Sequence, residues 1–229
     1  MSKKIFISTI PLQPKPLNKE ACDKCGRPYT GGLKKVSYSY GYTGNGSSLI
    51  KTRETSFPII PTIEDYFIPK EDEIEIILIK TLDTEGNTDY NYNLFMEELS
   101  VLGEDLNCRF PEPKIIEIDH NENPVKQVKL LRKLSECYED NAEVFMDITF
   151  GTKATEVAMF ASLAYAETIC GCEVRNVCYG KINHDTRESE LYDVRSLYDL
   201  NSIINGARFV KKENAREVIN ILWGENDEL

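Results

Sequence analysis

The chain has 229 residues, and 41% of them are hydrophobic, which is enough apolar material for a folded core and argues against disorder. Its net charge of −11 argues against strong non-specific binding to DNA or RNA, because such binding needs a basic surface. The sequence shows no apolar run near the roughly 20 residues that cross a bilayer, and its first apolar stretch is too short for a signal peptide. We therefore expect a soluble cytoplasmic protein.

The first part of the chain predicts one strand followed by a long insertion. Lys4–Thr9 has the apolar content of a short buried strand, and residues 11–35 are rich in proline, lysine and glycine. Two semi-alternating arms then flank Thr43-Gly44-Asn45-Gly46, which is typical of a β-hairpin because Asn-Gly turns supply positive φ angles. Residues 55–67 predict a short helix or an irregular connection, since this segment contains two prolines.

From residue 73 onward, strands and helices alternate about every 30 residues, which is typical of βαβ units on a parallel sheet. Strands are expected at Glu73–Thr81, Lys114–Asp119, Val144–Thr149, Glu173–Tyr179 and Glu190–Val194. Helices are expected at Tyr92–Leu106, Pro124–Tyr138, Thr152–Ile169, Leu200–Phe209 and Glu213–Trp223.

These elements predict an α/β fold: a Rossmann-like, doubly wound, mainly parallel sheet of about five to six strands. A hairpin-containing insertion of about residues 11–65 follows the first strand. We assign residues 1–205 to this domain and residues 206–229 to a C-terminal helical extension.

In such a sheet, ligands collect at the carboxyl ends of the strands. The expected strands end at Ser8-Thr9, Lys80-Thr81, Asp119-His120 and Asp147-Ile148-Thr149. The last of these is the most informative, because Phe150-Gly151-Thr152-Lys153 leads directly into a helix whose first N–H groups can receive a phosphate.

Two interpretations of this helix start remain open on spacing alone. In the first, Lys153 supplies a cation, and Thr149 or Thr152 supplies a hydroxyl, to a bound anion. In the second, Gly151 only makes a tight turn and Thr152 only caps the helix. A Walker A loop and a G-x-G-x-x-G motif after the first strand are both absent from the sequence, so we expect no dinucleotide cofactor.

The stretch MDITFGTKATEVAMFASLAYA resembles the signature of CARF domains, the CRISPR-associated Rossmann-fold sensors of type III systems. The matching positions are Asp147, Thr149, Gly151, Thr152 and Lys153. Phe150 departs from the pattern, which usually has glycine or histidine there. The opening KKIFISTI and the later VRNVCYGKIN with LYDVRSLYDL resemble further segments of the family.

The resemblance implies a homodimer whose two sites meet around a dyad and bind a cyclic oligoadenylate, with cyclic tetra-adenylate as the expected ring. An acid beside phosphates would repel them, so Asp147 is expected to point away and to orient the loop through hydrogen bonds. The residues implied in ligand binding are Ser8, Thr9, Ile10, Thr81, Thr149, Phe150, Gly151, Thr152 and Lys153.

The resemblance leaves the activity open. In a ring nuclease, Lys153 would stabilise charge and Ser8, or Thr9 beside it, would position the reacting groups, without a cofactor. The alternative is a non-enzymatic regulator that recruits a protein or nucleic-acid partner. A third interpretation is a generic nucleotide-binding protein unrelated to defence. No effector nuclease motif is found around His120 or His184, the two histidines of the chain.

Seven scattered cysteines, without a secretory signal, indicate reduced thiols. Cys22-x-x-Cys25 has the spacing of half a zinc site, and the other half would have to come from Cys170-Gly-Cys172 or from a second copy. Two free thiols are the preferred interpretation. On the expected hairpin, Tyr38, Tyr40 and Tyr42 either stack on adenine or form a packed face, and Arg53 either contacts phosphate or is solvated.

Overall fold

The computed structural model describes residues 2–16, 32–40, 53–120, 123–182 and 189–207, with the single positions 209, 211, 214 and 216. The chain divides after Asp193 into two units, Met1–Asp193 and Val194–Leu229. The second unit contains α5 (Arg195–Ala207), in which Arg195 Nε lies 3.1 Å from Asp199 Oδ2. Most of the helix expected at 213–223 lies outside the described residues.

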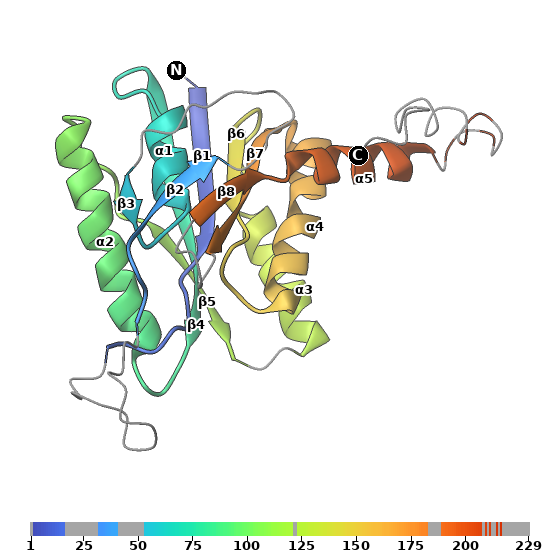
Figure 1. Ribbon diagram of the computed structural model, residues 1–229. Coiled ribbons are helices and arrows are strands. Elements are labelled where there is room, and N and C mark those ends of the chain that lie inside the picture. Colours follow the sequence, from blue (N-terminus) through green and yellow to red (C-terminus); the bar gives the residue numbers. More distant parts are fainter. Residues whose placement is uncertain are drawn as a thin grey trace. The chain divides into compact units, whose positions relative to one another are not determined.

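The first unit is built on a mixed, mainly parallel sheet of eight described strands in the order β3-β2-β8-β7-β6-β1-β4-β5 (Figure 1). Five of the strand pairings are parallel, and only β7–β8 and β2–β3 are antiparallel. The strands are β1 (Ser2–Thr9), β2 (Val36–Tyr40), β3 (Glu54–Thr55), β4 (Asp72–Leu82), β5 (Lys114–Asp119), β6 (Glu143–Asp147), β7 (Glu173–Ile182) and β8 (Ser189–Asp193). The α/β class is therefore confirmed.

The prediction of five to six strands was too low, because the insertion contributes two strands to the same sheet. β2 pairs in parallel with β8, and β3 pairs with β2 in antiparallel fashion. Without β2, the outer edge of β8 would present unpaired backbone groups. The β2–β3 hairpin after β1 is confirmed, although its expected turn at 43–46 lies outside the described residues.

Four helices cover the sheet, with α1 and α2 on one face and α3 and α4 on the other (Figure 1). They are α1 (Ile59–Tyr66), α2 (Asn87–Asp105), α3 (Pro124–Ser135) and α4 (Lys153–Cys170). The segment with two prolines is a helix because Pro58 precedes it and Pro61 lies in its first turn, where an N–H has no partner within the helix. Within the described ranges, none of the helices has the length and apolar content needed to cross a membrane.

The sheet carries its apolar core on both faces, as parallel strands covered by helices do. All residues of β1 from Lys4 to Thr9 are buried. Toward α1 and α2, the Phe6 and Phe145 rings stack with centroids 4.5 Å apart, and Phe57 meets Phe95 edge to face at 5.2 Å. These contacts fix β1 and β6 side by side, so that both end at the same edge of the sheet.

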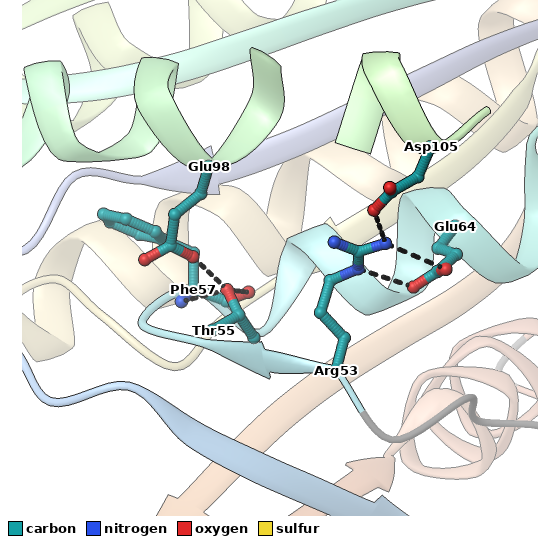
Figure 2. Close-up of polar contacts among 6 residues, drawn as sticks. All are labelled: Arg53, Thr55, Phe57, Glu64, Glu98 and Asp105. Carbon is teal, nitrogen blue, oxygen red and sulfur yellow. Dashed lines mark hydrogen bonds and ion pairs between the residues drawn. The ribbon is translucent and has the colours of Figure 1, made fainter. Parts of the chain in front are cut away.

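Polar contacts fasten the end of the insertion to both helices of this face (Figure 2). Arg53 Nε lies 2.9 Å from Glu64 Oε2 of α1, and Arg53 Nη2 lies 2.7 Å from Asp105 Oδ2 of α2. The buried Glu98 carboxylate of α2 accepts hydrogen bonds from the Thr55 hydroxyl and the Ser56 N–H. Arg53 is thus held in two ion pairs and is not simply solvated, whereas its contact with a phosphate stays a prediction.

The start of α2 depends on Asp83, which explains why the helix begins before the predicted Tyr92. Asp83 accepts hydrogen bonds from the N–H groups of Glu85, Asn87 and Thr88 at 2.8, 3.1 and 2.8 Å, and from the Thr88 hydroxyl at 2.7 Å. Burial alone would raise the pKa of Asp83, but these hydrogen bonds outweigh it and hold that pKa well below its ordinary range.

Replacing Asp83 by alanine removes these acceptors, and we expect the free energy of unfolding to fall by about 1 kcal/mol, as for a lost helix cap. Because the folded-state pKa is depressed, the contribution is complete above the unfolded pKa of about 3.9 and is lost as the pH falls below it. Urea unfolding of wild type and Asp83→Ala at pH 7 and pH 3 measures this. An unchanged difference at the two pH values would contradict the assignment.

Candidate functional site

The expected site lies where β6 ends and α4 begins. β6 ends at Asp147 rather than at the predicted Thr149, because the chain turns there and its hydrogen bonds to β7 no longer follow the strand pattern. The Ile148 N–H donates to the Cys178 carbonyl at 3.0 Å, and the Gly180 N–H donates to Thr149 Oγ1 at 2.7 Å. The loop of residues 148–152 is therefore attached to β7 at two successive points.

Asp147 is fully buried beneath this loop. Its carboxylate accepts hydrogen bonds from the Thr149 N–H at 2.9 Å and from the Ser8 hydroxyl at 2.9 Å. Burial raises the pKa of Asp147, while hydrogen bonds from Thr149, Ser8 and the Ile59 N–H at the start of α1 oppose the shift without cancelling it. As expected, the acid orients the loop through hydrogen bonds.

The loop needs a glycine at position 151 for its backbone conformation. Gly151 has a φ of +131°, a region that favours glycine over residues with a side chain. A Cβ built there would lie 3.5 Å from Thr9 Oγ1, which is an ordinary contact. The backbone angle, and not a lack of space, therefore fixes this residue, in agreement with the predicted tight turn.

Thr152 is the N-cap of α4. Its hydroxyl accepts a hydrogen bond from the Thr155 N–H at 3.2 Å, and the first backbone bond of the helix runs from the Glu156 N–H to the Thr152 carbonyl at 3.0 Å. The N–H groups of Lys153 and Ala154 precede this bond and have no acceptor among the described residues. The capped helix is therefore present, and it still offers two donors.

Lys153 is exposed at this helix start. Its ammonium group makes no ion pair within 4.0 Å of a described carboxylate. Burial raises the pKa of the neighbouring Glu156 carboxyl, an effect that the charge of Lys153 opposes. The site therefore combines two backbone donors, the positive end of a helix and one cation.

The structure does not bring the predicted residues of the first strand to the surface on which Lys153 lies. Ser8, Thr9 and Ile10 are buried. The Ser8 hydroxyl donates to Asp147, the Thr9 hydroxyl donates to the Met159 sulfur at 3.3 Å, and the Ile10 N–H bonds to the Ile79 carbonyl. Either hydroxyl would have to leave its present partner to contact a ligand, so their ligand and catalytic roles remain predictions.

Of the other predicted residues, Thr81 is buried near the end of β4, and Phe150 is half-buried in the loop. Tyr38 is 1% exposed, so the packed face is confirmed for this tyrosine and adenine stacking on it was wrong. The side chains of Tyr40 and Tyr42, like His184, lie outside the described residues.

Gly180 is a site residue that sequence reasoning missed. A Cβ on Gly180 would lie 2.6 Å from Pro58 Cγ and 3.1 Å from Tyr38 Cε1, so only glycine lets both side chains pack there. Its N–H holds Thr149, as described above. The Tyr-Gly pair at the end of the fifth predicted strand was the available signal, because glycine inside a strand often marks a close approach.

The zinc interpretation is not tested, because Cys22 and Cys25 lie outside the described residues. Cys172 is buried, and its thiol donates to the Glu139 carbonyl at 3.2 Å. Within the described ranges, no group of three or more His, Cys, Asp or Glu residues is placed to hold a metal ion.

The chain was compared with protein-family models and with curated proteins. No protein-family model matches the chain, and no curated protein matches it.

Asp147→Asn tests the buried carboxyl. Because its folded-state pKa is raised, the wild type loses stability as the pH rises above the unfolded value of about 3.9, whereas the variant carries no titrating group there. We expect the free energy of unfolding of the variant, relative to that of the wild type, to increase from pH 4 to pH 7.5. Urea titrations at the two pH values measure this, and a relative loss with rising pH would contradict it.

Proposed function

We propose that the chain is a CARF-type sensor with a Rossmann-like, doubly wound fold, which binds a cyclic oligoadenylate, with cyclic tetra-adenylate as the expected ring. One observation carries the proposal: the loop after β6, whose conformation requires Gly151, leads into a helix with two free N–H donors and the exposed Lys153. Such a helix start favours phosphate, and the helix dipole contributes roughly 0.3–2 kcal/mol.

The acidity of the chain does not oppose this assignment. The net charge of −11 is spread over the whole sequence, and exposed charges farther than about 8 Å are largely screened at physiological salt. Asp147, the acid next to the loop, is turned inward and is hydrogen-bonded to Ser8 and Thr149. The helix start therefore offers N–H donors and Lys153 to a phosphate, with the half-buried Glu156 as the acid of its first turn.

An exposed apolar row on α4 supports a homodimer. Val157, Tyr165 and Ile169 follow one another at helical spacing, with exposed fractions of 68%, 39% and 63%, and Ala161 is exposed between them. An apolar row of this kind is suited to a helix of a second copy. Because the row begins one turn after Lys153, a parallel contact of the two α4 helices about the dyad would bring two anion sites together, which suits a cyclic ligand with several phosphates.

Ring cleavage is the enzymatic form of the proposal. A ribose 2′-oxygen attacks the adjacent phosphorus, the bond from phosphorus to the 5′-oxygen breaks, and the products are a 2′,3′-cyclic phosphate and a 5′-hydroxyl. The 2′-hydroxyl loses a proton and the 5′-oxygen gains one. Lys153 and the two N–H donors would stabilise the negative charge that develops on the phosphate, and the held ring would supply the in-line geometry.

The alternative is a regulator that binds the ring and does not cleave it. The buried hydroxyls of Ser8 and Thr9 favour this alternative over cleavage, because in this structure neither is placed to assist a reacting phosphate. In the regulator, binding would rearrange the dimer and recruit a protein or nucleic-acid partner.

Lys153→Ala tests the anion site. We expect the variant to bind cyclic tetra-adenylate at least about tenfold more weakly than the wild type, since a charge-assisted contact contributes about 1.5–3 kcal/mol. Lys129→Ala is the matched control, because Lys129 is exposed on α3 and makes no ion pair with a described residue. Calorimetric titration measures the binding, and separation of labelled products with EDTA present measures cleavage.

The outcomes of this experiment separate the proposals. Linear products that are lost in Lys153→Ala would support ring cleavage, and tight binding without products would support the regulator. If the wild type bound cyclic tri-, tetra- and hexa-adenylate no better than single nucleotides, the sensor assignment would be wrong.

Ile169→Asp tests the dimer, because a carboxylate would be buried in the proposed contact between α4 helices. We expect the variant to be monomeric under conditions in which the wild type is dimeric. Val101→Asp is the control, since Val101 is 51% exposed on α2. Light scattering after gel filtration gives the masses, and a wild-type monomer both with and without ring would refute this contact.

A further inference from the structure

Tyr179 is a large aromatic side chain that is 42% exposed next to the anion site. The residues on either side of it are the two that hold the loop: the Cys178 carbonyl accepts from Ile148, and the Gly180 N–H donates to Thr149. The backbone of Tyr179 is therefore fixed alongside the loop that leads to Lys153.

Alternation along β7 shows which way the Tyr179 ring points. Cys178 lies toward α1, because the Thr62 hydroxyl contacts its sulfur at 3.6 Å, and Gly180 lies under Pro58, which precedes α1. Tyr179 between them points to the opposite face, the one that α4 covers. The ring and the donors at the start of α4 thus share one face of the sheet.

Further side chains on this face extend the surface along β7 and β8. Tyr192 is the cross-strand neighbour of Tyr179, and Lys181 follows two residues later on the same side of β7. The Lys181 ammonium lies 5.9 Å from the centroid of the Tyr192 ring and 3.6 Å from a Glu190 oxygen. A second tyrosine and an ion pair of Lys181 with Glu190 therefore lie beyond Tyr179 on this face, and the Tyr192 hydroxyl donates to the same Glu190 carboxylate.

Packing within the described chain does not explain why a tyrosine stands at position 179. Its ring is largely outside the core, and its hydroxyl makes no hydrogen bond with a described residue. A single exposed tyrosine is ordinary in itself. The position of Tyr179 is unusual, because the residues on both sides of it are hydrogen-bonded to the loop that leads to the phosphate donors.

We propose that Tyr179 is a base-stacking residue of the ligand site: when a phosphate lies at the N–H groups of Lys153 and Ala154, the purine of the attached nucleotide stacks on the Tyr179 ring. Aromatic rings bind bases in this way because every base presents a flat π face. This inference rests on the proposed function, since it requires a ligand that has both phosphate and base.

The test compares Tyr179→Ala, Tyr179→Leu and Tyr179→Phe in the full chain, with Tyr90→Ala as the matched control because Tyr90 is 40% exposed on α2. The probe is cyclic tetra-adenylate in which 2-aminopurine replaces one adenine, so that stacking quenches its fluorescence. We expect the alanine and leucine variants to bind at least about tenfold more weakly and to lose the quenching, since stacking on an aromatic ring contributes directly to the affinity for a base. Tyr179→Phe and Tyr90→Ala should retain both signals.

A second probe separates base from phosphate. Tripolyphosphate has no base, so its ability to compete for the site should fall in Lys153→Ala and stay unchanged in Tyr179→Leu. Suppose that wild type and Tyr179→Leu bound the labelled cyclic tetra-adenylate with equal affinity and equal fluorescence quenching, while Lys153→Ala lost binding. The stacking role would then be wrong, and the sensor assignment would hold. If the wild type bound no ring, both would be wrong.

Discussion

The geometry of the site depends on the burial of one carboxylate. Asp147 is removed from water, and the groups that compensate for this come from two separate parts of the chain: Ser8 at the end of β1 and Thr149 in the loop. A buried acid that lost one of these partners would be strongly unfavourable. β1, β6 and the loop are therefore held together at the edge of the sheet where the donors of α4 emerge.

From this carboxylate, a chain of contacts leads to the insertion. Thr149 accepts from the Gly180 N–H, Gly180 packs against Tyr38 and Pro58, and the segment before Pro58 is tied to α2 through Glu98. The insertion thus contributes two strands to the sheet and also supports the loop from the α1 face. This support explains why β7 carries a glycine at position 180, inside a strand, where another residue would push Pro58 away.

The lysines at the two edges of the parallel sheet differ in their ion pairs. At the amino ends of the strands, the buried Lys4 ammonium lies 2.8 Å from Asp72 and 3.6 Å from Glu143, and Lys3 contacts Glu75 and Glu139. At the carboxyl ends, Lys153 has no such carboxylate among the described residues. At the carboxyl ends, Lys80 and Lys126 are paired with Asp89 and Asp119 as well, so Lys153 differs from these lysines in leaving its charge, with two N–H donors, to a ligand.

Local patterns predicted much of this fold, and the misses have a common physical cause. Lys114–Asp119 was placed correctly, and α4 was placed within one residue of its observed bounds, because apolar periodicity and capping residues act over a few positions. The partner of Ser8 could not be predicted, because it lies 139 residues away. For the same reason, the hydroxyls expected to face a ligand are bound inside the fold.

The helix start also shows that capping and anion binding do not exclude each other. The sequence presented them as alternatives for Gly151, Thr152 and Lys153. An N-cap side chain, however, satisfies only one of the unpaired N–H groups at a helix start, and here Thr152 satisfies that of Thr155. The cap fixes the direction of the first turn, and so it fixes where the remaining donors of Lys153 and Ala154 point. A rigid, capped helix start is therefore a better anion receptor than an uncapped one, because its donors need not be ordered when the ligand arrives.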